Sequence, residues 1–206
     1  MKSEIDLQKI FLTRRNHPIV FKGNLVRLRP FEKEDAAIIA SRINHFETLM
    51  GIGRPLPISL QEEEEFVDYA IRETNKGRSI FYIIEENLEG QIIGSASLKG
   101  INSRNRTAEL GIAIFEPKNF NKGYGTEATK LILKVAFSVL NLNRIELNVY
   151  EYNSRAKHVY EKIGFKEIGK RRKFMYYGGK YYDSFLMDIL ATEYFDEYGK
   201  EDIVQI

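Results

Sequence analysis

The chain has 206 residues, 43% of them apolar, with 31 Lys and Arg against 29 Asp and Glu, which predicts one folded domain of nearly balanced charge. A net charge of +2 argues against dedicated nucleic-acid binding, and the lack of cysteine excludes disulfides, a thiol nucleophile and thiolate zinc sites. No segment approaches the roughly 20 apolar residues of a membrane span and the charged N-terminus is not a secretory signal, so we expect a cytoplasmic protein with no membrane partner.

The start of the chain predicts an extension, one strand and one helix. Residues 1–22 form the extension, and residues 25–29 alternate apolar and charged side chains with the period of a strand. Apolar side chains three and four positions apart predict a helix over residues 36–43. Residues 51–57 contain too much glycine and proline for any regular element.

A second helix and three strands follow. Ser59 and Glu62 have the spacing of a capping box, which opens the helix. We expect the acidic run at 62–65 to be a solvated first turn that suits the positive end of the helix dipole. Polar turns then separate three predicted antiparallel strands, at residues 80–84, 92–98 and 108–115.

Beyond residue 117 the apolar period changes to that of a long helix, over residues 128–139. A strand at 145–149 and a shorter helix at 156–163 come next. Two strands flank residues 177–180, because a Gly-Gly pair between aromatic runs predicts a hairpin. The acidic and aromatic tail, 191–206, predicts one more short helix.

This order of elements predicts an α/β fold of the α+β type, with a mixed, mostly antiparallel central sheet of six to seven strands and helices on both faces. The predicted organisation is an N-terminal extension at 1–22, one domain at 23–190 and a C-terminal tail at 191–206.

A glycine-rich loop leads into the long helix. Gly123 and Gly125 let successive backbone N–H groups turn inward, and at a helix N-terminus such groups form an anion cradle that suits a pyrophosphate. Tight turns use the same G-x-G pattern, and the loop has neither the third glycine of a dinucleotide site nor the G-K-[ST] of a P-loop. The candidate phosphate-binding residues are Lys122, Gly123, Tyr124, Gly125 and Thr126.

A second polar segment lies in the shorter helix. Asn153 can cap this helix, and Tyr160 lies two turns further on, so the two side chains can line one side of a groove. Taken alone, the pair is better explained as a helix cap and a core aromatic side chain.

Together, the three strands, the glycine-rich loop and the pattern N-x-x-A-x-x-x-Y-E-K-x-G-F at 153–165 resemble the GNAT superfamily of acyl-CoA N-acyltransferases. The resemblance covers about residues 25–190, and residues 108–114 are similar to the central strand before the loop. Residues 179–183 are similar to the ribosomal-protein serine/alanine acetyltransferase branch. Phe120 departs from the Gln or Arg usual at the first position of the loop motif, which removes one phosphate-side contact.

The resemblance implies acetyl-CoA as co-substrate, with its pyrophosphate on the N–H groups of residues 122–126. Asn153 is expected to hold the pantetheine arm by a hydrogen bond, and Tyr160 to donate a proton to the leaving thiolate. Backbone N–H groups of the central strand are expected to stabilise the oxyanion, at on the order of 3 kcal/mol for each donor. The strand residues that pair with the arm are Ile112, Ala113 and Ile114.

An ammonium group must lose a proton before it attacks, so a base is needed near neutral pH. Glu109, a carboxylate on the central strand, is the candidate base, and a surface or salt-bridged role is the equal alternative. The three histidines are scattered without ligand spacing, so no metal site is expected.

Residues 51–57 and 174–182 lie where this family builds its acceptor groove. Arg54 is the candidate contact for an acceptor carboxylate or phosphate, and Tyr176 and Tyr181 are candidate aromatic walls, with cross-strand pairing as their alternative. Arg54 and Lys180 are the only charged residues in these two segments, and the lack of a carboxylate favours a peptide or a neutral amine over a polycation.

The sequence therefore predicts an acetyl-CoA-dependent N-acetyltransferase that transfers the acetyl group directly within a ternary complex, with a protein or peptide N-terminal amine as acceptor. The first alternative acceptor is a small-molecule amine: a polyamine, an aminoglycoside or an amino-acid-like compound. The alternative from another class is a non-catalytic acyl-CoA-binding or ribosome-associated module. The oligomeric state stays open, with a homodimer as one option.

Overall fold

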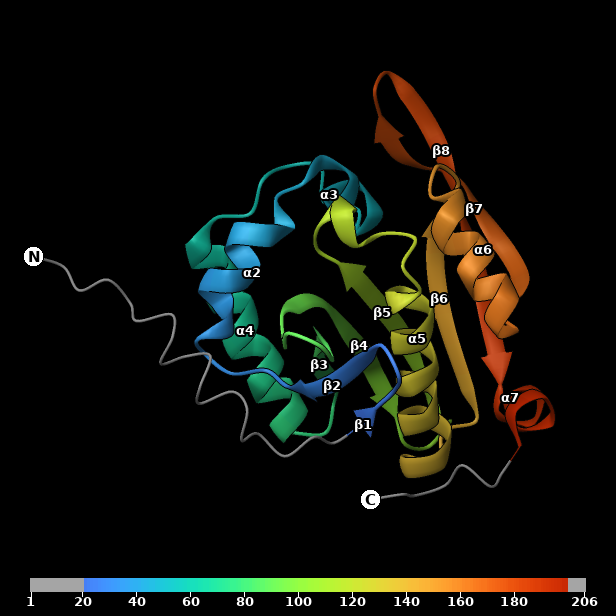
Figure 1. Ribbon diagram of the computed structural model, residues 1–206. Helices are drawn as coiled ribbons and strands as arrows, with labels where there is room; N and C mark the ends of the chain where they lie inside the picture. Colours follow the sequence, from blue (N-terminus) through green and yellow to red (C-terminus); the bar gives the residue numbers. More distant parts are fainter. Residues whose placement is uncertain (1–20, 200–206) are drawn as a thin grey trace, which may run out of the picture.

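The computed structural model describes residues 21–199 (Figure 1). The strands are β1 (Phe21–Lys22), β2 (Val26–Pro30), β3 (Ile80–Glu86), β4 (Ile92–Asn102), β5 (Thr107–Ile114), β6 (Arg144–Tyr150), β7 (Lys166–Tyr177) and β8 (Lys180–Leu190). The helices are α2 (Asp35–Ile43), α3 (Phe46–Gly51), α4 (Leu60–Asn75), the 3₁₀ turn η1 (Pro117–Asn119), α5 (Tyr124–Lys134), the π-helical turn η2 (Val135–Val139), α6 (Ser154–Ile163) and α7 (Ala191–Tyr198). None of the helices within these residues is both long and apolar enough to cross a membrane.

All the strands join one sheet, in the order β1-β2-β3-β4-β5-β6-β8-β7. Neighbouring strands are antiparallel except β5 and β6, which run parallel and are connected through η1, α5 and η2. The predicted α+β fold with a mixed, mostly antiparallel sheet is confirmed. The sheet has eight strands rather than six to seven, because Phe21 and Lys22 pair with Leu28 and Arg27.

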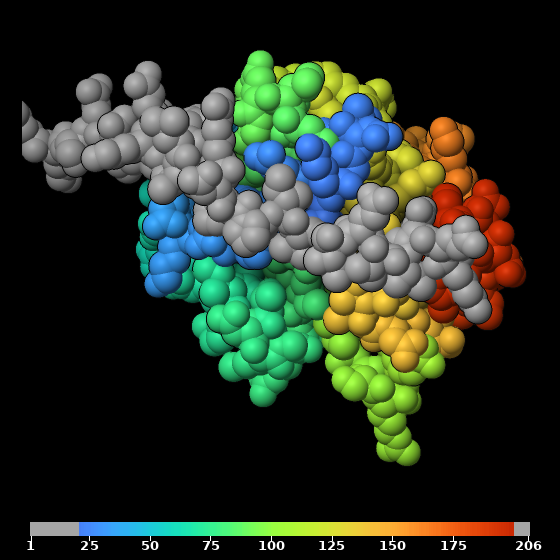
Figure 2. All heavy atoms as spheres, turned by 60° about the horizontal axis from the view of Figure 1, so that its bottom comes forward, coloured from blue at the N-terminus to red at the C-terminus, as the bar shows by residue number. Residues whose placement is uncertain are grey.

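The two faces of the sheet bury different helices (Figure 1). On one face, α2 and α4 cover a core that contains Ile39, Val67 and Ile83. On the other face, α5, α6 and α7 cover a core that contains Ile132 and Ile145. Figure 2 looks at the bottom of Figure 1 and shows the blue start of the described chain lying beside the yellow of α5, with α7 in red further along.

Two turns form as the local sequence predicts. At the start of α4, Ser59 Oγ accepts from the Glu62 N–H at 3.2 Å, and Glu62 Oε2 accepts from the Ser59 N–H at 3.0 Å, which completes the capping box. Between β7 and β8, Gly178 and Gly179 have φ of +57° and +79°, as a two-residue hairpin requires.

Two helical details differ from the prediction. No element is predicted immediately before residue 51, whereas α3 ends there; the six residues of α3 are too few for an apolar period to show. The long helix is α-helical only as far as Lys134, and its last predicted turn is the π-helical η2.

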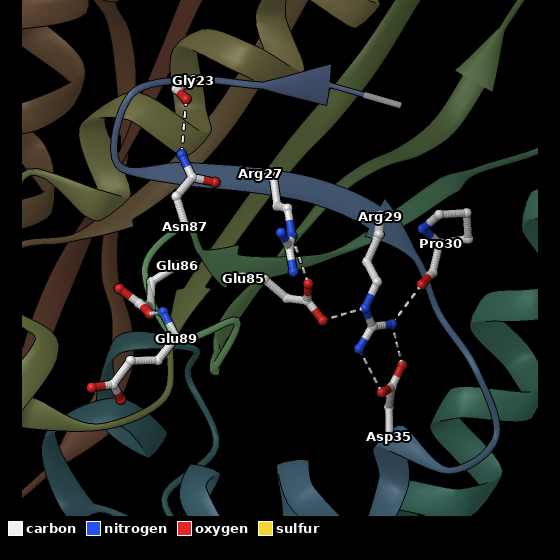
Figure 3. Close-up of polar contacts among 9 residues, drawn as sticks. All are labelled: Gly23, Arg27, Arg29, Pro30, Asp35, Glu85, Glu86, Asn87 and Glu89. Atoms are coloured by element: carbon white, nitrogen blue, oxygen red, sulfur yellow. Dashed lines mark hydrogen bonds and ion pairs between the residues drawn. The ribbon is translucent and has the colours of Figure 1, made fainter. Parts of the chain in front are cut away.

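A buried ion network ties the first strands to α2 (Figure 3). Arg29 makes a two-pronged contact with Asp35, at 2.7 Å for both hydrogen bonds, and its Nε donates to Glu85 at 2.6 Å. Arg27 donates to the other oxygen of Glu85 at 2.8 Å. Arg29, Asp35 and Glu85 are at most 3% exposed. Each buried carboxylate therefore meets a guanidinium, which offsets the cost of removing these charges from water.

We predict that Arg29→Ala lowers the free energy of unfolding by about 3–5 kcal/mol, because buried Asp35 loses its guanidinium and buried Glu85 keeps only Arg27. Urea denaturation at pH 7 measures the change. Lys33→Ala is the matched control: Lys33 pairs with Asp68 at 3.4 Å with both side chains largely exposed, so its removal should cost less than about 1 kcal/mol. Equal losses in the two variants would contradict the prediction.

Candidate functional site

A cleft opens in the sheet because β5 and β6 pair over a short distance. Their parallel ladder starts where the two strands start and ends at Glu109 and Glu146. Beyond that point β5 continues to Ile114 alongside β4, and β6 continues to Tyr150 alongside β8. The backbone groups of residues 110–114 that point toward β6 therefore have no strand partner and are available to a ligand.

Helix α3 bridges the open end of this cleft. Thr48 Oγ1 donates to the carbonyl of Phe115, just past β5, at 2.7 Å. Tyr152, just past β6, donates from its hydroxyl to the carbonyl of Met50 at 2.9 Å. The two bonds hold α3 to both sides of the opening.

The glycine-rich loop lies beside the cleft, where α5 begins. Gly123 is the N-cap of α5 with φ of +83°, and a Cβ there would lie 3.1 Å from Leu25 Cδ1, so any other residue would strain the loop. The Glu127 N–H donates to the Gly123 carbonyl at 3.0 Å, at the start of the helical ladder. The N–H groups of residues 124–126 precede that bond, so they lack an acceptor within the helix and can bind an anion.

Glu127 fixes the position of this loop. Its carboxylate accepts from the backbone N–H groups of Asn24, Leu25 and Val26 at 2.7–2.9 Å. A Cβ on Gly23 would lie 2.5 Å from Glu127 Cδ, so the turn before β2 needs glycine there. The first turn of α5 is thereby attached to the edge of the sheet.

A cavity of about 150 Å³ lies between the loop, α3 and α6, and we name it the α5-side cavity. Lys122 is exposed and does not line it. The other residues predicted to bind the co-substrate do line it: Ile112, Ala113, Ile114, Gly123, Tyr124, Gly125, Thr126, Asn153 and Tyr160. Tertiary structure thus brings three segments, at 112–114, 123–126 and 153–160, to one cavity.

Asn153 and Tyr160 both face this cavity from α6. Asn153 Oδ1 accepts from the Ala156 N–H at 3.2 Å and so caps the helix, while its Nδ2 group lies toward Gly51. Burial raises the pKa of Tyr160 to about 12, so its hydroxyl keeps its proton at neutral pH and can only donate it.

Arg155 is a cation at this cavity that the sequence analysis did not consider. Its guanidinium carbon lies 3.6 Å from the centre of the Phe120 ring, and both side chains line the α5-side cavity. Because Phe120 stands where the loop motif usually has Gln or Arg, the positive charge here comes from α6 instead of the loop.

A second cavity, of about 480 Å³, opens on the other face of the sheet, and we name it the α4-side cavity. Side chains from α2, α4 and strands β4 to β7 line it. Six residues line both cavities: Gly51, Ile52, Ile112, Ala113, Asn148 and Tyr160. The two cavities therefore meet at the cleft, where groups entering from opposite faces of the sheet reach the same point.

The acidic run at the start of α4 is not the fully solvated turn that the sequence analysis expects. Glu62, Glu64 and Glu65 are exposed, but Glu63 is 3% exposed and lines the α4-side cavity. Burial raises the pKa of Glu63 from 4.5 to about 7. Arg54 also lines this cavity, and it pairs with Glu62 at 3.0 Å.

Glu109 enters the α4-side cavity from β5. It accepts from Asn148 Nδ2 at 3.3 Å and makes no ion pair with any residue in the described range 21–199. Asn148 Oδ1 in turn accepts from Arg171 at 3.0 Å. Since Asn148 lines both cavities, its partner Glu109 lies close to their junction.

The hairpin tyrosines lie outside both cavities. Tyr176 and Tyr181 are 59% and 57% exposed, and their rings are 5.0 Å apart as a cross-strand pair. The aromatic wall of the α4-side cavity comes instead from Tyr150 and Phe174, which stack at 6.5 Å. Phe174 lies in a stretch of β7 where the register with β8 shifts, between Arg171 and Met175, and β8 separates β7 from β6 in the sheet, so this contact depends on tertiary packing.

Comparisons with known proteins agree with this geometry. The family model "Acetyltransferase (GNAT) domain" matches residues 26–166. The spermidine N(1)-acetyltransferase of Escherichia coli K12 is 30% identical over 173 residues, which are 84% of this chain and 90% of that protein. A putative ribosomal N-acetyltransferase of Bacillus subtilis is 35% identical over 107 residues, 52% of this chain and 57% of that one.

A solved structure has the same architecture. The spermidine N-acetyltransferase of Vibrio cholerae, crystallised with CoA and spermine, superimposes with a TM-score of 0.72 at 29% identity, covering 82% of this chain and 97% of that one. The resemblance inferred from the sequence is confirmed.

We predict that Glu63→Gln stabilises the fold at pH 8 by about 3 kcal/mol but changes little at pH 4.5. As pH rises from 4.5, the unfolded chain loses this proton first while the folded chain holds it to about pH 7, so the wild-type Glu63 progressively destabilises the fold. Glutamine has no charge to bury. Urea denaturation at both pH values measures the effect, and exposed Glu64→Gln should show no such difference. If Glu63→Gln changed the free energy of unfolding by the same amount at both pH values, the raised pKa of Glu63 would be contradicted.

Proposed function

The chain belongs to the GNAT family of acetyl-CoA-dependent N-acetyltransferases, and we propose that its acceptor is a polyamine-like small molecule that carries two or more amino groups. The observation that carries this proposal is the pair of carboxylates, Glu63 and Glu109, that line the α4-side cavity without an ion-pair partner among residues 21–199.

The α5-side cavity suits the co-substrate acetyl-CoA. The N–H groups of residues 124–126 offer a cradle for the pyrophosphate, and Arg155 adds a positive charge beside it. The unpaired edge of β5 at Ile112, Ala113 and Ile114 offers backbone groups to the amide-bearing arm. Asn153 Nδ2, which does not take part in the helix cap, is available as a donor to the same arm.

The α4-side cavity suits a polycationic acceptor better than a peptide carboxylate or phosphate. Arg54, the predicted contact for an anionic group, is engaged by Glu62, while Glu63 and Glu109 offer negative charge. Among the relatives that match more than four fifths of this chain are spermidine N(1)-acetyltransferases, whereas the putative ribosomal relative matches about half of it. These findings support the small-molecule alternative over the protein N-terminus that the sequence favoured.

In this proposal, deprotonation of the acceptor takes place on the α4 side of the cleft, and the co-substrate is bound from the α5 side. Glu109 accepts a proton from the acceptor ammonium, and the free amine attacks the acetyl carbonyl carbon. N–H groups of residues 112–114 stabilise the developing oxyanion, with a contribution on the order of 3 kcal/mol for each donor. The carbon–sulfur bond then breaks, and Tyr160 donates its proton to the departing thiolate. The new amide nitrogen loses its surplus proton to solvent, and Tyr160 regains a proton from solvent.

An acceptor screen with detection of the released thiol tests the proposed acceptor class. Spermidine and spermine are compared with n-butylamine and with a peptide that has an N-terminal alanine, all at saturating acetyl-CoA. We expect kcat/KM for spermidine to exceed that for n-butylamine at least about 100-fold, because a second ammonium adds one charge-assisted contact with a buried carboxylate. Preferred acetylation of the peptide would refute the proposal.

We predict that Tyr160→Phe lowers kcat roughly 100-fold while KM for acetyl-CoA stays within about twofold, because the lost hydroxyl acts in the transition state. The pKa of about 12 predicts that the wild type shows no loss of activity from Tyr160 ionisation below about pH 10. Steady-state kinetics measure both effects. Tyr69→Phe, on the outer part of α4 and 41% exposed, is the control and should match the wild type. An unaltered kcat in Tyr160→Phe would remove Tyr160 from the mechanism.

A further inference from the structure

Glu63 is a buried carboxylate that the mechanism above does not use. It is 3% exposed, lines the α4-side cavity, and its Oε1 has no hydrogen-bond partner among the residues that the structure describes. Buried carboxylate oxygens are normally hydrogen-bonded, because an unsatisfied one loses its hydration without compensation. The stability of the fold therefore does not explain why a carboxylate is buried at this position.

The capping of α4 does not explain the burial of Glu63 either. Ser59 and Glu62 already complete the capping box, so the helix needs no further carboxylate. Glu64 and Glu65, next in the sequence, are exposed to solvent as a helix start allows. Glu62 also lines the cavity, but it is exposed and paired with Arg54, so Glu63 is the buried one of the four glutamates 62–65.

The charged groups around the cavity give Glu63 no direct ion pair, although the charge of Arg54 partly opposes the rise that burial causes in the pKa of Glu63. Arg54 is paired with Glu62 at 3.0 Å, and Arg171 donates to Asn148 while lying 5.2 Å from the centre of the Phe174 ring. The full set of titratable or charged side chains that line the cavity with Glu63 is Arg54, Glu62, Lys99, Glu109, Tyr150, Tyr160 and Arg171. None of the described basic groups makes an ion pair with Glu63. The buried carboxylates Asp35 and Glu85 differ from Glu63, because each of them forms an ion pair with Arg29.

The two free carboxylates belong to different walls of the cavity. Glu109 is on β5 and contacts Asn148, at the junction with the α5-side cavity. Glu63 is on α4, which packs on α2 and β3 rather than along β5. Apolar side chains from these elements, among them Phe31, Ile39 and Phe66, line the cavity as well. A carboxylate at the reacting end, apolar lining and a second carboxylate on α4 match an amine, a methylene chain and a second amine.

We infer that Glu63 binds the non-reacting ammonium group of a diamine or polyamine acceptor and thereby selects acceptors with a second positive charge. This inference rests on the proposed function and assigns the residue that makes the acceptor choice. Glu63 is a specificity residue here, and the reacting amine remains with Glu109.

The kinetic test compares Glu63→Gln with Glu64→Gln, which removes the same charge from an exposed neighbour. With spermidine, we expect Glu63→Gln to raise KM at least about 30-fold, since loss of one partner of a buried charge pair costs that much or more. Its kcat, its KM for n-butylamine and its KM for acetyl-CoA should stay within about threefold of the wild type. Glu64→Gln should match the wild type with every substrate, and Glu63→Asp, which keeps the charge, should restore part of the spermidine affinity.

Calorimetry measures the number of protons released when spermidine binds, and a purely structural role of Glu63 would not change that number. Spermidine is titrated into the protein with CoA at pH 6.5 in two buffers of different ionisation enthalpy, so that protons released on binding can be counted. Because the pKa of Glu63 is raised to about 7 by burial, most molecules hold this proton at pH 6.5, and an arriving ammonium should expel it. The wild type should release a proton fraction that Glu63→Gln lacks, while the other cavity groups contribute equally to both.

The outcomes separate the two proposals. If the wild type acetylates spermidine in preference to n-butylamine but Glu63→Gln keeps the spermidine KM and the proton release, the inference about Glu63 fails and the proposed function stands. An equal fall in kcat with every acceptor would place Glu63 at the reacting amine and overturn its role as an anchor. If the wild type acetylates no polyamine, the proposed function fails, and the role of Glu63 fails with it.

Discussion

The short parallel ladder between β5 and β6 is the constraint on which the site depends. After Glu109 and Glu146 the two strands keep their other neighbours, β4 and β8, but no longer pair with each other. A sheet interior normally satisfies every backbone group, so a gap at its centre is costly unless something fills it. The gap is held open by α3, which bonds to Phe115 on one side and to Tyr152 on the other. Both cavities exist because this opening passes through the sheet.

The two faces of the opening differ in charge for local reasons. On the α5 face, a helix start with unsatisfied N–H groups, a glycine N-cap and Arg155 give a positive environment. On the α4 face, Glu63 and Glu109 make no ion pair among residues 21–199 and offer two acceptors for a cation, in a lining that also contains Arg54, Lys99 and Arg171. An anionic co-substrate and a cationic acceptor are thus expected to approach from opposite faces, so that their charges do not compete for one cavity.

The buried charges show how stability and binding are divided within one domain. Arg29, Asp35 and Glu85 satisfy one another in a region away from the cleft, and there the network holds β2 and β3 to α2 (Figure 3). Glu63 is buried to a similar extent without such partners. A fully paired carboxylate has no capacity left for a ligand, whereas an unpaired one destabilises the fold until an ammonium group arrives.

Local sequence determined the elements whose cause is local. The capping box of Ser59 and Glu62, the Gly178-Gly179 hairpin and the glycine-rich loop before α5 each depend on a few neighbouring residues, so they could be predicted. The order of these elements, with the motif around Asn153, also predicted the GNAT fold and the use of acetyl-CoA.

Only the tertiary structure decided which side chains share a cavity. Glu63 has three acidic neighbours in sequence, but its spacing of four and seven residues from Val67 and Ala70 places it on the buried face of α4. That this face reaches a cavity follows from the way α4 packs on α2 and β3. For the same reason Tyr176 and Tyr181 lie outside the cavities, while Tyr150 and Phe174 form its aromatic wall. The co-substrate could be inferred because the glycine-rich loop and residues 153–165 together carry a family resemblance that implies acetyl-CoA. The choice of acceptor depends on side chains that meet only after strands and helices distant in sequence have packed.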